Sequence, residues 1–336
     1  MNHKESPQDQ INSFIALFSN GQTQEALDAI EALIKDYPND PVFYNISGVF
    51  YKQIGQLDEA IKRFEKALAI NPDYAEAHNN QGVTLQDLGL MDEAVISYEK
   101  AITSNPDYTE AHNNLGVTLQ NLGLMDEAVI SYEKAIASNP DHAPAHNNLG
   151  NIFKELKQLD EAVKSYGKVI AINTDFPEVH YNLGNTLREL GQFETAIKSY
   201  EKVITINPEF SEAHYNLGNS LRELGQLETA IKSYEKAITI NPDYHEAYFN
   251  LGSSFQQLGK LDNAIKHYEK AIAIRPNYAA AYYKLSYLKK YTASDPEIAK
   301  MQSLLSSDNI TQLGRINLCF ALAKVNENLD NQNELF

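Results

Sequence analysis

The sequence repeats with a period of 34 residues, and this period constrains the fold more than any other feature. The units align without gaps, and the third and fourth units differ at only five positions. A chain built in this way needs no single central core, because each unit packs against its neighbours. Eight units cover residues 7–40, 41–74, 75–108, 109–142, 143–176, 177–210, 211–244 and 245–278, and a ninth begins at Ala279.

Within each unit, two runs of positions carry small, apolar or aromatic side chains. Positions 4, 7, 8, 11 and 14 form the first run and positions 20, 24 and 27 the second, with the spacing of one helix face in each run. A glycine at position 15, such as Gly225, ends the first helix because glycine adopts positive φ readily. An acid at position 18, such as Glu228, suits the start of the second helix, and Pro242 ends it. Each unit is therefore predicted to be a pair of helices, A and B.

Two further positions indicate close packing inside each unit. Position 8 is glycine in seven units, for example Gly218, and position 20 is alanine in all eight, for example Ala230. A glycine inside a helix costs about 1 kcal/mol in helix propensity, so a compensating contact is expected. We predict that these small residues let helices A and B approach each other closely.

The eight positions 4, 7, 8, 11, 20, 24, 27 and 32 resemble the signature of the tetratricopeptide repeat (TPR). The seventh unit follows that signature closely, reading SEAHYNLGNSLRELGQLETAIKSYEKAITINPDY. The resemblance implies an all-α, right-handed superhelical solenoid of antiparallel helix pairs, with the A helices on the concave side. Gln81, Lys157 and Thr174 depart from the pattern, and Gln81 is expected to be a buried amide.

The ends of the chain are not repetitive. Residues 1–6 are expected to be a disordered tail, residues 279–291 helix A of the ninth unit, and residues 292–336 a connector with C-terminal helices. Within the last segment, helices are predicted over residues 296–305 and 310–329, and Leu335 and Phe336 would open one more helix. This segment resembles the region that links repeats to the catalytic domain in bacterial TPR-containing sulfotransferases.

Composition excludes several classes of partner. The net charge is −17, from 45 acidic and 28 basic residues, so neither nucleic acid nor an anionic membrane surface is an expected partner. The polar start of the chain shows no secretory signal, and no apolar run is long enough to span a membrane. The single cysteine, Cys319, fits a reducing compartment and is predicted to be buried. A cytoplasmic protein is expected.

A series of histidines occupies position 4, on the packing face of helix A. Equivalent atoms of neighbouring repeats are roughly 10 Å apart, whereas ligands lie within about 2.1 Å of a shared metal ion. The series is therefore predicted to be core, and no metal, cofactor or catalytic motif is expected, so the chain is not predicted to be an enzyme. The histidines are His78, His112, His146, His180 and His214.

Position 6 suggests where a ligand binds. On a helical wheel this position points away from the packing face, and an amide there offers both a donor and an acceptor to an extended peptide backbone. The pattern resembles the asparagine ladder in the repeats of O-linked N-acetylglucosamine transferases, which implies that it lines a peptide-binding groove. Alternatively, the asparagines are inert copies or tie neighbouring helices together. The ladder comprises Asn80, Asn114, Asn148, Asn182, Asn216 and Asn250.

Other positions in or beside the expected groove change along the chain. The C-terminal half gains aromatic and arginine side chains, which are enriched at protein interfaces. The alternative is a solvated face whose arginines and glutamates pair across repeats. The predicted groove residues of this half are Tyr181 and Tyr215 at position 5, Asn185 and Asn219 at position 9, and Arg188 and Arg222 at position 12.

Two functions fit these patterns. The first is a protein-interaction scaffold that binds an extended peptide or a partner protein in the groove. The alternative is the substrate-recognition arm of a truncated sulfotransferase or glycosyltransferase without its catalytic domain. The apolar residues Leu318, Phe320, Leu322 and Val325 are expected to be poorly covered, which favours a cut end and predicts self-association there.

Overall fold

The computed structural model describes residues 13, 16–18, 20–307 and 310–333. Every regular element in these residues is a helix, and the two helices of each repeat from the second to the eighth pack side by side. The chain divides into an N-terminal body, residues 1–173, and a C-terminal body, residues 174–336. The all-α solenoid of helix pairs is confirmed. The predicted tail, residues 1–6, and the helix predicted to open at Leu335 lie outside the described residues.

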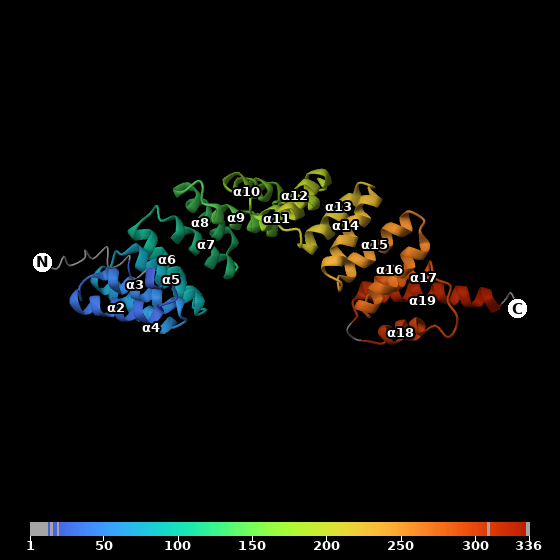
Figure 1. Cartoon of the computed structure of the whole chain (residues 1–336), viewed down its shortest axis with the longest axis horizontal. Coiled ribbons are helices and arrows are strands. Elements are labelled where there is room, and N and C mark those ends of the chain that lie inside the picture. The colour runs from blue at the N-terminus through green and yellow to red at the C-terminus, as the bar shows by residue number, and fades with distance from the viewer. Residues whose placement is uncertain (1–12, 14–15, 19, 308–309, 334–336) are drawn as a thin grey trace. The chain divides into compact units, whose positions relative to one another are not determined.

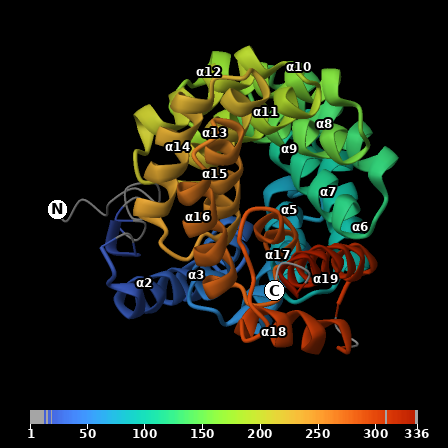
Figure 2. The same ribbon diagram turned by 90° about the vertical axis from the view of Figure 1, so that its right-hand side faces the viewer.

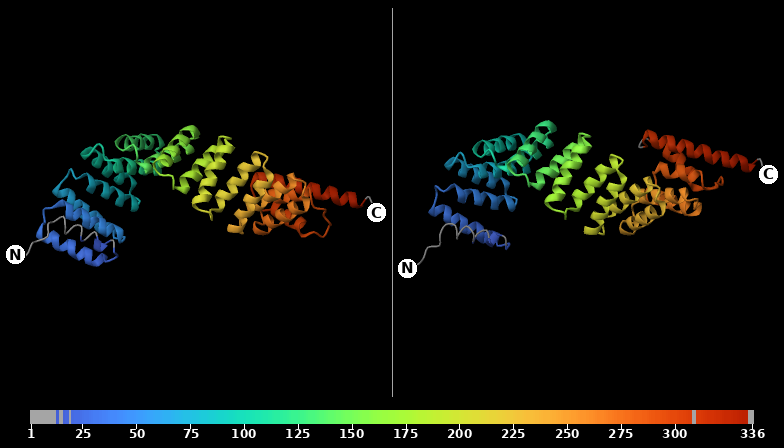
Figure 3. Two further views of the ribbon diagram at one scale, coloured as in Figure 1. Left: turned by 45° about the horizontal axis from the view of Figure 1, so that its top comes forward. Right: turned by 90° about the horizontal axis from the view of Figure 1, so that it is seen from above.

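The N-terminal body stacks its helices in chain order (Figures 1 and 3). From the second repeat on, each A helix packs against the B helix of its own repeat and against the B helix of the repeat before. The helices are α2 (Thr23–Asp36), α3 (Pro41–Gln53), α4 (Leu57–Ile70), α5 (Ala75–Asp87), α6 (Met91–Ser104), α7 (Thr109–Asn121), α8 (Met125–Ser138), α9 (Ala143–Glu155) and α10 (Leu159–Ile172).

The C-terminal body continues the same alternation for three repeats. The repeat pattern then gives way to a shorter A helix and two further helices. The helices are α11 (Pro177–Glu189), α12 (Phe193–Ile206), α13 (Ser211–Glu223), α14 (Leu227–Ile240), α15 (His245–Gln257), α16 (Leu261–Ile274), α17 (Ala279–Ser286), α18 (Pro296–Leu305) and α19 (Gln312–Asn333).

The turn between helices A and B uses the expected glycine. At Gly89 φ is +79°, its N–H donates to Gln86, and the N–H of Leu90 donates to the carbonyl of Leu85 at 2.9 Å. These bonds satisfy the last carbonyls of helix A. Lys157 occupies the same position with φ of +61°, so the fifth repeat keeps the turn at the cost of a strained side-chain-bearing residue.

The glycine at position 8 makes room for an aromatic ring. A Cβ atom added to Gly150 would lie 2.7 Å from the ring of Tyr166, which is fully buried at position 24 of the same repeat. Helices A and B therefore approach closely, as predicted. The group that a Cβ atom would meet is the aromatic ring at position 24, a contact that the small residues alone did not indicate.

The histidines of position 4 fasten each A helix to the loop before it. Nε2 of His78 lies 2.8 Å from the carbonyl oxygen of Pro72, and the other four histidines make the corresponding contact at 2.8–3.0 Å. All five are buried, so the prediction that they are core residues is confirmed. Thr174 replaces proline in one loop, and its carbonyl oxygen accepts the bond from His180 equally well.

The last helices pair in an order that the sequence did not indicate. Helix α17 ends at Ser286, short of the predicted Tyr291, and packs against both α16 and α19, with α18 beside α19 (Figure 2). Leu318 and Val325 are fully buried in this packing, so the expectation that they are poorly covered is wrong. Phe320 is 57% exposed, as expected.

Two other burial predictions are corrected. Cys319 is exposed, because α19 buries the neighbouring Leu318 and Ala321 and turns position 319 away from the cluster that they join. Gln81 is half-buried and lines a shallow surface hollow, so its amide does not carry the penalty of full burial. Among the described helices, none is both long and apolar enough to cross a membrane.

Candidate functional site

The predicted groove residues all lie on A helices, and the A helices form one continuous face in each body. Helix α5 contacts α3 and α7, and α13 contacts α11 and α15, whereas successive B helices within the described residues make no comparable approach. The A helices are therefore the closely spaced side of each body. Side chains at positions 5, 6 and 9 meet across these A-to-A contacts.

In the N-terminal body, each ladder asparagine reaches back to the preceding repeat. Nδ2 of Asn80 donates to Oδ1 of Asn45 at 3.0 Å, and Asn114 and Asn148 donate in the same way to position 5 of the repeat before, at 3.1 and 3.2 Å. The three ladder residues are half-buried. Within the described residues their side chains make no other hydrogen bond. Each therefore keeps one amide N–H and its amide oxygen.

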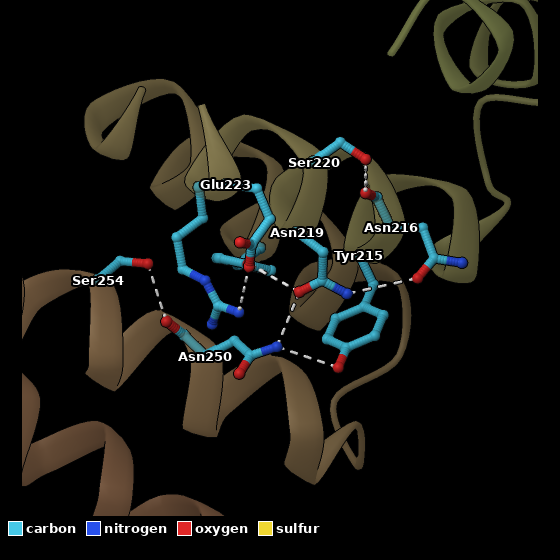
Figure 4. A network of polar contacts seen from close by, with 9 residues as sticks. Tyr215, Asn216, Asn219, Ser220, Glu223, Asn250 and Ser254 are labelled. Carbon is cyan, nitrogen blue, oxygen red and sulfur yellow. Dashed lines mark hydrogen bonds and ion pairs between the residues drawn. The ribbon is translucent and has the colours of Figure 1, made fainter. Parts of the chain in front are cut away.

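In the C-terminal body, the ladder amides are more fully engaged. Nδ2 of Asn250 donates to the hydroxyl of Tyr215 at 3.0 Å and to Oδ1 of Asn219 at 2.8 Å (Figure 4). Asn216 makes the equivalent pair of bonds, to Tyr181 and Asn185, each at 3.0 Å. Each of these two amides therefore donates both of its N–H groups within the protein.

The helical wheel misplaced several of these side chains. Asn216, Asn219 and Asn250 are buried, with exposed fractions of 7–9%. The expectation that position 6 points away from the packed side is therefore wrong for Asn216 and Asn250, and Asn219 at position 9 is buried with them. The neighbouring A helix covers these positions. The alternative that the asparagines tie neighbouring helices together describes the observed bonds of Asn80, Asn114, Asn148, Asn216 and Asn250.

Position 9 serves the core as well as the neighbouring repeat. The hydroxyl of Tyr234, a fully buried side chain, donates to Oδ1 of Asn219 at 2.8 Å, and Tyr200 donates to Asn185 at the same distance. Burial raises the pKa of Tyr234, so this hydroxyl stays protonated and acts as a donor. Each of these asparagine oxygens accepts two hydrogen bonds.

The aromatic residues of position 5 are held between other rings. Tyr181 stacks on Phe210 with ring centroids 5.0 Å apart, and Tyr215 lies 4.8 Å from the ring of Tyr244. Both are half-buried, and burial raises the pKa of Tyr215. Their hydroxyls accept the ladder bonds, so these tyrosines join repeats to one another in addition to presenting an edge to the surface.

The two arginines of position 12 differ in exposure. Arg188 is exposed and Arg222 half-buried. Nη2 of Arg222 lies 3.3 Å from a carboxylate oxygen of Glu223, the next residue of the same helix. A pair of this kind at the surface contributes little to stability. The structure does not show Arg222 paired across repeats, which was the alternative considered for it.

Sequence reasoning missed Asn45, Asn79 and Asn113, the acceptors of the ladder bonds in the N-terminal body. The signal was present, because positions 5 and 6 are both asparagine in the third and fourth repeats. One of each pair donates backward and the other accepts from the following repeat. No group of three or more His, Cys, Asp or Glu side chains in the described ranges is placed to hold a metal ion.

These features define a helical-pair repeat protein with an A-helix face rich in amides. A TPR repeat model matches residues 48–89, 87–123, 150–187, 184–221 and 218–259. Tetratricopeptide repeat models match residues 14–40, 109–142, 131–164 and 245–278. The chain belongs to the tetratricopeptide-repeat family.

Solved structures share the fold. A TPR repeat-containing protein of Cytophaga hutchinsonii is 18% identical, with a TM-score of 0.61 over 70% of this chain and 96% of that one. YrrB, described as a TPR protein with an unusual peptide-binding site, is 23% identical, with a TM-score of 0.52 over 56% of this chain and 96% of its own. Pseudomonas aeruginosa pilF is 22% identical, with a TM-score of 0.52 over 60% and 92%. No curated protein matches the chain.

Proposed function

We propose that the chain is a protein-interaction scaffold that binds an extended peptide along the A helices, and that the peptide backbone is gripped by the ladder of the N-terminal body. The observation that supports this is the unused half of each amide in Asn80, Asn114 and Asn148. A free N–H beside a free carbonyl oxygen matches the alternating groups of a peptide backbone. The proposal gives the chain no catalytic role.

The spacing of the ladder suits an extended ligand. Neighbouring packed helices lie roughly 8–10 Å apart, and an extended chain rises about 3.3 Å per residue. One ladder amide therefore meets about every third residue of the peptide. In the C-terminal body, Asn216 and Asn250 have no spare N–H, so there the proposal assigns contact to Arg188 and Arg222 instead.

The first experiment captures peptides from a random library with the parent chain and with Asn80→Ala, Asn114→Ala, Asn148→Ala combined. The matched control is Ile96→Lys with Ile130→Lys, on the B helices. These isoleucines are 51% and 52% exposed, and five other repeats carry lysine at that position. We expect the ladder variant to lose the captured peptides and the control to keep them. Equal capture by a folded ladder variant would overturn the proposal.

The second experiment replaces each backbone N–H of a captured peptide by N-methyl, one position at a time. Because each ladder oxygen accepts a backbone N–H, we expect losses of affinity that recur about every third residue. A single sensitive residue, or none, would show that side chains alone hold the peptide. Circular dichroism at each step confirms that the protein variants are folded.

The transferase-arm alternative stays a prediction. Both functions use the same A-helix face. Leu318 and Val325 are buried, so they no longer support the interpretation that the C-terminal end is cut. Self-association through the C-terminal end and a cytoplasmic location also stay predictions. Self-association now depends on Leu313, Ile316 and Phe320, which are 68%, 45% and 57% exposed on α19. A sedimentation mass that does not change with concentration would count against it.

A further inference from the structure

The loop between α16 and α17 breaks the charge pattern of the repeats. The six loops that close the second to seventh repeats all carry asparagine at position 31 and an acid at position 33, as in Asn241 and Asp243. In five of those loops the asparagine oxygen accepts the backbone N–H of the acidic residue, at 3.2 Å for this pair. The eighth repeat carries Arg275 and Asn277 instead. The local charge changes from −1 in the other six loops to +1.

A third residue change, at the start of the next helix, also makes the local charge less negative. The A helices α5, α7, α11, α13 and α15 have glutamate as their second residue, whereas α17 has Ala280. Arg275, Asn277 and Ala280 all line one cleft of about 450 Å³. The three departures from the repeat therefore meet at one place, and each removes negative charge or adds positive charge there.

The cleft also has an apolar wall. Leu304 of α18, Ile310 of the segment before α19 and Leu313 of α19 line it. Leu313 is 68% exposed and is the most exposed of the large apolar side chains in the described residues. A ligand that covered this wall would remove apolar surface from water. The volume lies within the usual range of small-ligand sites, roughly 300–1,000 Å³.

Two hydrogen bonds hold the guanidinium of Arg275 in place, and neither of them is to a carboxylate. Its Nε–H donates to Asn277 at 3.3 Å, and an Nη1–H donates to Nε2 of His245 at 2.9 Å. Glu246 is engaged by the other ring nitrogen of His245, at 3.0 Å. Within the described residues Arg275 forms no ion pair. Three of the five N–H donors of an arginine therefore remain.

Tyr278 completes the positioning of this arginine. The guanidinium carbon of Arg275 lies 5.7 Å from the centre of the Tyr278 ring, and Tyr278 also lines the cleft. A guanidinium fixed by a ring and two hydrogen bonds loses little conformational freedom on binding an anion. Arginine forms strong charge-assisted hydrogen bonds with carboxylates.

We propose that this cleft binds a carboxylate carried on an apolar group, with the carboxylate on Arg275 and the apolar part against Leu304, Ile310 and Leu313. The site is separate from the asparagine ladder and does not depend on it. The carboxylate belongs either to a small organic acid or to a protein, as a chain terminus. The chemistry is shared, and the test separates the two sources.

The test measures binding of N-acetyl-leucine by calorimetry, with N-acetyl-leucinamide as the uncharged analogue. The key variant is Arg275→Asn, which installs the residue that six other loops carry. Lys260→Asn is the matched control, because it removes one charge from an exposed side chain outside the cleft. Loss of a charge-assisted hydrogen bond is expected to weaken binding of the acid roughly ten- to a hundred-fold in Arg275→Asn.

We expect the parent and Lys260→Asn to bind the acid equally, and the amide to bind as weakly to the parent as the acid does to Arg275→Asn. Binding of acid and amide with equal affinity, or an Arg275→Asn variant that binds the acid like the parent, would overturn the proposal. A peptide that ends in leucine with a free carboxylate distinguishes the sources. Tighter binding than N-acetyl-leucine assigns the site to a chain terminus, and equal binding assigns it to a small acid. The ladder variant is expected to keep this binding, so failure here leaves the peptide-binding proposal untouched.

Discussion

The buried tyrosine hydroxyl of each repeat needs an acceptor, and removing that acceptor gives a sharp test of the structure. In the seventh repeat, Oδ1 of Asn219 accepts from Tyr234 at 2.8 Å. We predict that Asn219→Val lowers the free energy of unfolding by about 1–3 kcal/mol, the cost of a buried polar group left without a partner. The amide of Asn250 contributes less to this loss, because it retains its bond to Tyr215.

The repeats themselves supply a rescue. In the third and fourth repeats the equivalent hydroxyls of Tyr98 and Tyr132 donate to Gln86 and Gln120 at position 12, at 3.1 and 3.0 Å, and position 9 is valine. Asn219→Val combined with Arg222→Gln recreates that arrangement. We expect the second change to restore most of the lost stability, since the glutamine oxygen takes up the hydroxyl.

The second repeat supplies the control. Phe64 occupies position 24 there, and positions 9 and 12 are Val49 and Lys52, neither of which accepts from a core hydroxyl. Asn219→Val is therefore expected to cost less in a Tyr234→Phe background. Urea unfolding followed by circular dichroism measures all four variants. An equal cost of Asn219→Val in both backgrounds, or no rescue by glutamine, would refute the acceptor argument.

Three further outcomes are expected. Gly150→Ala places a methyl 2.7 Å from the Tyr166 ring, whereas Gly167→Ala meets no atom within 4 Å, so urea midpoints should show the first about 1–3 kcal/mol less stable than the second. Lys157→Gly should stabilise by about 1 kcal/mol, because φ is +61°; an unchanged midpoint would contradict this. Burial lowers the pKa of His78 and His214. The folded chain then binds fewer protons than the unfolded chain, so stability should fall as pH drops below about 6.5, and by less in a doubly His→Tyr variant.

The tyrosine control for the pH experiment comes from the chain itself. Position 4 is tyrosine in the second, eighth and ninth repeats. In the second and ninth, the hydroxyls of Tyr44 and Tyr282 donate to the equivalent loop carbonyl at 3.2 and 3.1 Å. At these two sites tyrosine makes the bond and carries no charge in this pH range. An equal pH slope for parent and variant would assign the acid sensitivity to carboxylates instead.

The sequence predicted the helices closely because their signals are local. Helix ends were marked by glycine at position 15, as in Gly89, and by the loop prolines. The spacing of apolar residues along each helix indicated which side is apolar. The wheel failed for Asn216, Asn219 and Asn250 because it describes one isolated helix. Their burial arises where the A helices of neighbouring repeats meet, which no pattern within a single helix reveals.

The C-terminal end was harder for a related reason. Leu318, Ala321 and Val325 mark one face of α19, but nothing in the residues between says that α19, rather than α18, pairs with α17. Cys319 was misjudged because an apolar neighbourhood in sequence does not assign a residue to the buried side. The segments after the last repeat lack the 34-residue period, so the sequence does not indicate which of these helices pack together. Only the structure shows this pairing.

Positions 9 and 12 connect the core to the A-helix face. Where position 9 becomes asparagine, as in Asn185 and Asn219, it supplies the acceptor for the core tyrosine, and position 12 is released from that task. Arginine then appears at position 12, as Arg188 and Arg222. The same asparagines accept the ladder N–H groups of the following repeat, which removes those donors from the surface. On the A-helix face, the exchange of acceptor therefore replaces free amide N–H groups by guanidinium groups. Under the proposed function, the amides of the N-terminal body contact a peptide backbone, and the arginines of the C-terminal body contact acidic side chains.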